Sequence, residues 1–253
     1  MGEMIRLDRF LAGCGTGSRK HAVTLIKAGR VSVDDTIISD PGHKVVEDAC
    51  VKLDGKKLIY ERYSYYMLNK PAGCVSAVKD RLSDTVLSFL TGVNTNGLFP
   101  VGRLDKDTEG LLIITNDGEL CHDIISPRRH VEKVYYVICD KPLPGNAVSK
   151  FKKGIDIGDD VPCLPAKLKK SGETEERPAY ELTITEGRFH QVKRMFMSFD
   201  SSVVYLKRIS VGGVKLDETL DPGMFRPLTH DEIVTLKERN DKEPSDEGSE
   251  SQG

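Results

Sequence analysis

The loop of residues 102–110 places a guanidinium close to a carboxylate, between two short apolar stretches. If the chain stays extended there, Arg103 and Asp105 project to one side and Leu104 to the other. Leu104 can then anchor the loop in the core while both charged groups face one opening. A carboxylate in such an opening can do nucleophilic or acid–base chemistry. The alternative is an ordinary surface loop with an Arg–Asp ion pair, which contributes little.

A second stretch, residues 186–196, places basic residues on a predicted helix. One apolar face is formed at i, i+3, i+4 and i+7 by Val192, Met195, Phe196 and Phe199. By the 3.6-residue period, Lys193 lies about 100° from Val192, at the edge of that face, and Arg194 about 200° away. Lys193 is therefore best placed to reach a partly buried carboxylate, and Arg194 to reach phosphate. Alternatively, Lys193 only covers apolar surface with its aliphatic stem.

Two tyrosines stand side by side in the stretch of residues 132–137. Strand alternation puts Tyr135 and Val137 on one face and Tyr136 on the other. One ring can then pack in the core while the other lines a pocket. A core tyrosine is the simpler explanation for either ring.

Several classes of site are excluded by spacing. The histidines show no H-x-x-x-H or H-E-x-x-H pattern, so we expect no metal site. Neither a Walker loop, nor G-x-G-x-x-G, nor G-x-S-x-G is present. The six cysteines are scattered without a C-x-x-C, which favours a reduced cytosol over a disulfide scaffold. No run of about 18 apolar residues predicts a membrane span, and no apolar h-region predicts a signal peptide.

The net charge of −2 hides an uneven distribution. Residues 240–253 carry five acidic residues against one lysine, so the rest of the chain is weakly basic. Residues 1–30 carry six basic against two acidic residues, and residues 186–208 carry five against two. Positive charge clustered in this way is typical of a surface that binds a polyanion, although solvated helix faces are the alternative.

The elements that must hold these groups begin with a small module in the first sixty residues. A helix around Leu7–Leu11 is followed by one with Ser18 as N-cap and Gly29 just past its end. In that second helix Ala22, Val23 and Ile26 are expected to share the buried face. A strand at Val31–Val33 with a turn at 34–35 follows. A hairpin then joins 51–53 to 57–59 through Asp54-Gly55.

The rest of the chain, about 65–239, mixes short strands and helices without regular alternation. Strands are expected at 65–68, 98–101, 111–115, 135–138 and 180–185, with turns at 69–73 and 116–118. Thr229 and Glu232 have the spacing of a capping box for a helix over 230–239. The pattern favours an α+β mixed sheet over a doubly wound one.

Four motifs follow one another along the chain. They are Leu68-Asn69-Lys70-Pro71-x-Gly73; Gly102-Arg103-Leu104-Asp105 with Thr108 and Gly110-Leu111-Leu112; Lys133-x-Tyr135; and Glu186-Gly187-Arg188-x-His190-Gln191-Val192-Lys193-Arg194-Met195-Phe196. In this order they resemble the RsuA-like family of pseudouridine synthases. The version of the last motif is more similar to the small-subunit rRNA branch of that family than to the large-subunit branch.

The N-terminal segment resembles an S4 RNA-binding module, the usual partner of that catalytic domain. The likeness is carried by Arg6-Leu7-Asp8, Ser18-Arg19, Ala22 and Gly29-x-Val31-x-Val33. One departure is the turn after the strand, which is Asp34-Asp35 instead of the usual Asp/Asn-Gly. The resemblance implies an S4-type α/β module at 1–62 and a catalytic domain at 63–239. That domain is expected to have a mixed, largely antiparallel sheet with flanking helices, giving an α+β chain. The acidic tail, 240–253, lies outside the pattern and is expected to be disordered.

The resemblance implies that a uridine in ribosomal RNA, expected to be 16S rRNA, is isomerised to pseudouridine. The bond from N1 to C1′ breaks and a bond from C5 to C1′ forms, which requires no redox cofactor, nucleotide or metal. Asp105 would begin the reaction by attacking the sugar or the base, or as a base on the sugar. Lys193 would keep that carboxylate ionised, and Tyr135 would stack on the uracil or handle a proton.

The target base must leave its stack to reach a carboxylate, so RNA contacts are expected around the site. The predicted RNA-binding residues are Arg103, then Arg6, Arg19, Lys20, Lys27 and Arg30 of the N-terminal module, then Arg188, His190 and Arg194. The expected partner is ribosomal RNA or a ribosome precursor. We expect a cytoplasmic monomer with no membrane attachment.

Two other functions compete. The first is a non-catalytic S4-type RNA-binding or ribosome-assembly protein on an inactive synthase fold, which the retained Asp105, Tyr135 and Lys193 argue against. The second is a glycoside-type hydrolase, which generally needs two carboxylates flanking the bond. Asp107 and Glu109 are candidates, but neither is expected to share a face with Asp105 and a basic partner.

Overall fold

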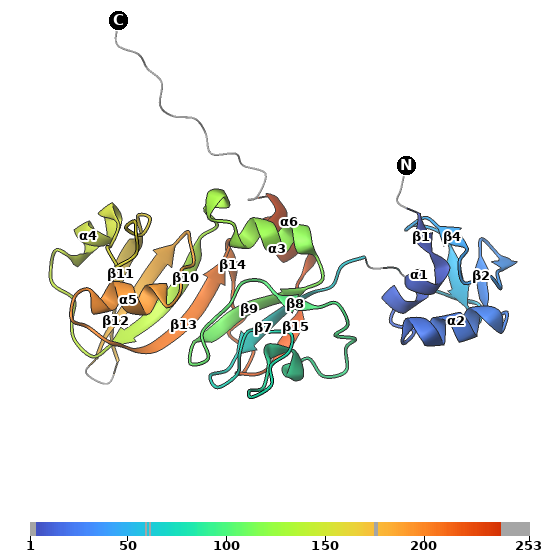
Figure 1. The fold of residues 1–253 in the computed structure, drawn as a ribbon, viewed down its shortest axis with the longest axis horizontal. Helices are drawn as coiled ribbons and strands as arrows, with labels where there is room; N and C mark the ends of the chain where they lie inside the picture. Colours follow the sequence, from blue (N-terminus) through green and yellow to red (C-terminus); the bar gives the residue numbers. More distant parts are fainter. Residues whose placement is uncertain (1–3, 59, 61, 175–176, 239–253) are drawn as a thin grey trace, which may run out of the picture. The chain divides into compact units, whose positions relative to one another are not determined.

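A computed structural model gives the structure and describes residues 4–58, 60, 62–174 and 177–238 (Figure 1). The chain divides into two units. The first holds the residues up to Ser64 together with Gly92–Asn96, and the second holds the remainder from Tyr65 on. The predicted acidic tail lies outside the described residues.

The first unit packs two helices against short strands. Its elements are β1 (Ile5–Arg6), α1 (Leu7–Gly13), α2 (Arg19–Lys27), β2 (Val31–Val33), β3 (Thr36–Ile37), β4 (Lys44–Val45), β5 (Val51–Leu53) and β6 (Lys56–Lys57). The predicted start of α2 is confirmed, because the Ser18 hydroxyl accepts a hydrogen bond from the His21 N–H at 3.2 Å. The expected apolar face was wrong in one position: Leu25 is buried with Ala22 and Ile26, whereas Val23 is only half-buried.

Two tight hairpins build the four-stranded sheet of this unit, in the order β3-β2-β5-β6. Asp54 and Gly55 have φ of +51° and +80°, as the predicted two-residue turn requires. Asp34 and Asp35 also have positive φ, +46° and +64°. Aspartate tolerates this left-handed region better than most residues, so the Asp-Asp turn forms without glycine.

The second unit is built on one large sheet with helices beside it. Its strands are β7 (Tyr65–Lys70), β8 (Phe99–Pro100), β9 (Glu109–Thr115), β10 (Lys133–Cys139), β11 (Lys167–Thr174), β12 (Arg177–Ile184), β13 (Val203–Val211), β14 (Val214–Lys215) and β15 (Phe225–Pro227). Its α-helices are α3 (Gly118–Ile125), α4 (Ala147–Lys153), α5 (Gln191–Met197) and α6 (His230–Glu238), with 3-10 turns at Val86–Phe89 and Pro127–Arg129.

The strand order in this sheet is β11-β12-β10-β13-β9-β7-β15, with β14 beside β13 and β8 beside β9. β13 and β9 run parallel, and the other pairs are antiparallel. The expected mixed, largely antiparallel sheet is therefore confirmed. Parallel neighbours need a long crossover between them, and here the chain leaves β9 and returns as β13 after forming the β10–β12 half of the sheet.

Helices cover the sheet at two places (Figure 1). α3 and α6 lie side by side over β7, β9 and β13, where Leu120, Ile124 and Leu236 join the core. Toward the other end, Phe196 of α5 meets Phe151 of α4 edge-on, with ring centroids 5.8 Å apart. The predicted capping box of α6 is confirmed in both directions, with Thr229 N–H to Glu232 at 2.7 Å and Glu232 N–H to the Thr229 hydroxyl at 3.2 Å.

The close approach of β9 to β13 depends on Gly110. Its φ is +99°, and a Cβ built there would lie 2.2 Å from the carbonyl oxygen of Arg208. Both facts restrict the position to glycine, because a larger residue would be strained and would push the two backbones apart. Arg208 itself is buried and donates a hydrogen bond to the Leu111 carbonyl at 2.8 Å. This junction lies directly after the loop that carries Asp105.

Candidate active site

The loop carrying Asp105 is anchored by its neighbour in the chain, Leu104. The Leu104 side chain is buried, as the alternation predicts. Its backbone is also held, because the Ser76 hydroxyl donates to the Leu104 carbonyl at 2.9 Å and accepts from the Leu104 N–H at 3.0 Å. The Thr108 N–H then closes a turn onto the Asp105 carbonyl at 3.1 Å. Asp105 is thus presented from a fixed backbone, its side chain 30% exposed.

Lys70, at the end of β7, fixes the far side of the same loop. It is fully buried and its ammonium donates to the carbonyls of Thr108 at 2.8 Å and Pro71 at 3.0 Å. The Gly73 N–H reaches the Lys106 carbonyl at 2.7 Å. Burial lowers the pKa of Lys70 below its ordinary value. The strand runs two residues further than predicted, because Asn69 and Lys70 still pair with Leu111 and Gly110 of β9.

Lys193 and Asp105 are brought together as predicted. The Lys193 Nζ lies 3.3 Å from Oδ2 of Asp105, and the Nε2 of His190 lies 3.7 Å from Oδ1. The shortest contacts of Lys193, however, are to Asp107, at 2.6 and 2.8 Å. The expectation that Asp107 has no basic partner shared with Asp105 was wrong. The turn that follows Asp105 brings the second carboxylate back to the same ammonium.

Lys193 and Asp107 are both held in their charged forms. Burial alone would lower the pKa of Lys193, but the Asp107 hydrogen bond and the Asp105 and Asp107 charges raise it above its ordinary value. The hydrogen bond from Lys193 is the main reason why the pKa of Asp107 is below its usual range. Lys193 is therefore a cation throughout the physiological pH range.

Tyr135 of β10 lines the same cleft as Asp105 and Lys193. It is buried, whereas Tyr136 on the opposite face packs edge-on against Tyr205 at 6.4 Å. One ring therefore lines a pocket and the other packs against a neighbouring strand, as the alternation indicates. Thr108 lines this cleft as well, and its buried hydroxyl has no hydrogen-bond partner among the described residues.

A lysine two residues before Tyr135 lies on the same face of β10. Lys133 is buried and donates to the Val131 carbonyl at 2.9 Å. Burial and the nearby Arg208 charge lower its pKa to about 8.

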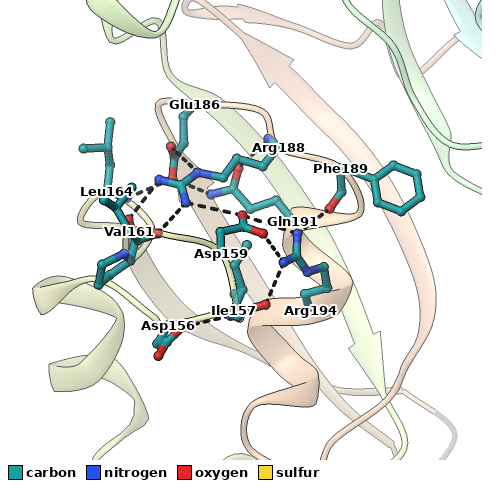
Figure 2. Close-up of polar contacts among 12 residues, drawn as sticks. Asp156, Ile157, Asp159, Val161, Leu164, Glu186, Arg188, Phe189, Gln191 and Arg194 are labelled. Carbon is teal, nitrogen blue, oxygen red and sulfur yellow. Dashed lines mark hydrogen bonds and ion pairs between the residues drawn. The ribbon is translucent and has the colours of Figure 1, made fainter.

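Two predicted RNA-binding residues, Arg188 and Arg194, are engaged within the protein (Figure 2). Arg188 donates to Glu186 at 3.0 Å and to the carbonyls of Val161 at 2.7 Å and Pro162 at 2.9 Å. Arg194 forms an ion pair with Asp159 and donates to the Ile157 carbonyl at 2.7 Å. Arg194 was expected to project into solvent; instead it joins the 157–162 segment to α5. An RNA-binding role for either arginine stays a prediction.

The other predicted RNA-binding side chains differ in their exposure and in whether they already form ion pairs within the protein. Arg103 is exposed at the cleft, and its guanidinium makes no hydrogen bond or ion pair to the described residues. Arg6 and Arg19 both bind the buried Asp8, at 3.0 and 3.1 Å, while staying at least half exposed. Arg30 forms an ion pair with Asp54. Lys20 and Lys27 of α2 are exposed.

Four residues of the site were not predicted in their roles: Lys70, Ser76, Thr108 and Asp107. Ser76 lies in a segment with no motif, so no signal could have found it. Lys70 and Thr108 belong to motifs quoted above, but their backbone-holding and pocket-lining positions depend on tertiary contacts. Asp107 follows Asp105 by two residues, which could have suggested a shared partner.

Comparisons with known proteins identify the family to which the chain belongs. The family model for RNA pseudouridylate synthase matches residues 64–198. The chain belongs to this family of RNA pseudouridine synthases. The S4 domain model matches residues 5–49, so the expected S4 module is confirmed in the first unit. Among the described residues of this synthase, no helix has the length and apolar character needed to cross a membrane.

Similar proteins span nearly the whole chain. The synthase is 41% identical over 236 residues to the uncharacterized RNA pseudouridine synthase YtzG of Bacillus subtilis, covering 92% of this chain and 99% of that protein. It is 40% identical over 233 residues to the ribosomal small subunit pseudouridine synthase A of Vibrio cholerae, with the same coverage. A solved structure described as a pseudouridylate synthase matches with a TM-score of 0.64 and 37% identity, covering 92% and 99% of the two chains.

Proposed function

We propose that this synthase converts one uridine of small-subunit ribosomal RNA to pseudouridine. The observation that carries the proposal is the Asp105–Lys193 ion pair at 3.3 Å in a cleft also lined by Tyr135. The choice of RNA is supported by relatives that are about 40% identical over their full length and are named for the small ribosomal subunit. Retention of all three site residues favours an active enzyme over an inactive RNA-binding protein on the same fold.

The proposed chemistry is an isomerisation that begins at the Asp105 carboxylate. Either it attacks the uridine as a nucleophile or it takes a proton from the sugar, and in both cases it must be ionised. The N1–C1′ bond then breaks, the uracil turns over, and C5 bonds to C1′. The proton lost from C5 is balanced by one gained at N1, so the product has the mass of the substrate. Tyr135 is placed to stack on the uracil or to handle a proton.

The substrate must reach this cleft as a base swung out of its RNA stack. Arg103, exposed beside Asp105, is placed to bind phosphate or to occupy the space that the base leaves. One chain supplies Asp105, Lys193 and Tyr135, in keeping with a monomeric enzyme. A ribosomal RNA substrate is in keeping with a cytoplasmic protein.

The proposal is tested with the purified full-length protein and a transcript of small-subunit rRNA. We expect one new pseudouridine, no change in RNA mass and no free uracil. Release of uracil would instead indicate a hydrolase, and an unmodified RNA together with unmodified precursor subunits would contradict the proposal. Pseudouridine mapping of rRNA from cells with and without the gene then identifies the position, as the one site lost with the gene.

The S4 module is expected to hold RNA by charge rather than to take part in the chemistry. Deleting residues 1–62 should weaken RNA binding and flatten its dependence on salt, because fewer phosphates are neutralised. A milder version replaces the exposed Lys20 and Lys27 by glutamine in the full chain. Each lost phosphate contact should reduce the slope of log K against log salt by about one. Binding titrations at several salt concentrations measure this, and unchanged slopes in both variants would show that the module does not contact RNA.

A further inference from the structure

Phe189 is an exposed aromatic residue at the edge of the active-site cleft. It is 73% exposed, and it is the one aromatic side chain among the large exposed apolar residues of the described chain. Its ring stacks on His190 with centroids 3.8 Å apart and planes 18° from parallel. The ring has no place in the core, and the high exposure leaves the face away from His190 open. A flat apolar surface of this kind in water suits a planar ligand.

The backbone beneath this pair is rigidly held. The Phe189 carbonyl accepts a hydrogen bond from Arg194 at 3.1 Å, and Arg194 is itself bound to Asp159. The Arg188 N–H donates to the Gln191 side chain at 2.9 Å, and His190 has the left-handed φ of +49°. Figure 2 shows the Phe189 ring projecting away from this polar network. This partly exposed network holds the backbone from which the ring projects, which lowers the entropy lost when a ligand binds.

The pair also lies next to the reactive carboxylate. Phe189 and His190 line a wide cleft together with Arg103, Asp105 and Lys106. The His190 Nε2 lies 3.7 Å from Asp105, so the stack extends outward from the catalytic group. The neighbouring Arg103 and Lys106 are cationic, which suits an RNA backbone passing over the same rim.

We propose that Phe189 and His190 form a stacking platform for an unpaired RNA base that adjoins the target uridine. The inference rests on the proposed function, since it assumes an RNA whose target base is flipped. Flipping one nucleotide leaves its neighbours without a stacking partner, and an aromatic side chain can replace it regardless of base identity. The open face of Phe189 is placed to do this while the uridine enters beside Asp105.

Kinetics of the Phe189→Ala variant on the small-subunit rRNA transcript test the platform. We expect KM for RNA to rise about tenfold, because base–aromatic stacking typically contributes that much or more to binding. We expect kcat at saturating RNA to stay within about twofold, because Asp105, Lys193 and Tyr135 are untouched. Phe189→Tyr should keep the wild-type KM. Val148→Ala on α4, which removes another exposed apolar side chain outside the cleft, should change neither constant.

A spectroscopic test uses the fact that the chain contains no tryptophan. Phe189→Trp then gives a single tryptophan on the platform, and Val148→Trp gives a single tryptophan on α4. Saturating RNA should quench the emission at position 189 through base stacking and leave position 148 nearly unchanged.

The results separate the platform from the proposed function. If wild-type protein modifies the RNA but Phe189→Ala has an unchanged KM and the tryptophan at 189 is not quenched, the platform is wrong and the function stands. Quenching at 189 by a protein-only ribosomal fraction and not by RNA would assign the ring to a protein partner and overturn the proposal. If the wild-type protein modifies no RNA, the proposed function is wrong and the platform is wrong with it.

Discussion

The Asp105→Asn variant should form pseudouridine at less than about 1% of the wild-type rate while binding RNA nearly as tightly. Asparagine keeps the size and shape of the side chain but cannot ionise, so it can neither attack the uridine nor accept a proton. The loop should keep its conformation, because Leu104, Ser76 and Lys70 hold it through contacts that do not involve the carboxylate. Single-turnover kinetics and RNA-binding titrations on the same preparation measure the two effects.

Asp107→Asn is the matched control for this result. Asp107 lies two residues away, binds the same lysine at 2.6 Å and is 73% exposed in its side chain. Its removal frees Lys193 to pair fully with Asp105, so activity should change by no more than a few-fold. Should Asp107→Asn be as inactive as Asp105→Asn, the assignment of Asp105 as the sole reactive carboxylate would be wrong. A two-carboxylate mechanism would then have to be considered.

Lys193→Met should lower the rate about a hundredfold, the usual cost of removing one charged group that stabilises a reacting centre. Methionine retains the stem that packs at the edge of α5, so the loss is that of the ammonium. Single-turnover kinetics on the small-subunit rRNA transcript measure the loss.

The pH dependence of the wild type follows from the direction of the two shifts. The pKa of Lys193 is raised. Its charge therefore contributes fully to the stability of the fold below the ordinary lysine pKa of about 10.4, and this contribution is lost only as pH rises through the raised pKa. The pKa of Asp107 is lowered. Its charge therefore contributes to the stability of the fold above the ordinary aspartate pKa, and this contribution is lost as pH falls through the lowered pKa. Loss of the Lys193 charge therefore sets no limit on activity below about pH 10.

Lys193→Arg tests whether charge alone is enough. Arginine remains cationic but presents a wider, planar group, so we expect partial activity. A Lys193→Met rate within a few-fold of that of the wild type would mean that the ammonium does not stabilise the reacting centre.

The features readable from the sequence were those governed by local rules. The Ser18 cap, the Asp54-Gly55 hairpin and the Thr229–Glu232 capping box depend on a few adjacent residues, and all three are present. Lys193 was placed correctly for a similar reason, since the helical period alone puts it at the edge of the apolar face. The fold class and the family followed from the order of the motifs.

The features that were not predicted from the sequence depend largely on contacts between parts of the chain that are far apart in sequence. Helices α3 and α4 and strands β11 and β13 were not predicted. α4 and β11 are rich in lysine and other polar residues, whereas β13 was considered only as part of the basic stretch 186–208. Asp117 was expected in a turn, but its carboxylate accepts from the Leu120 N–H at 3.1 Å and caps α3. Arg194 was placed by helical angle alone, which cannot reveal that Asp159 approaches from another loop.

The contact between Gly110 and the Arg208 backbone bears on how this enzyme can be engineered to act on another RNA. At this contact the distance between β9 and β13 is set by backbone atoms. The side chains around it can therefore vary without moving the loop that carries Asp105. Surface positions such as those on α2 or at the cleft rim are therefore reasonable places to diversify. Position 110 should be left out of any such library, because even one added methyl group would disturb the geometry on which every variant depends.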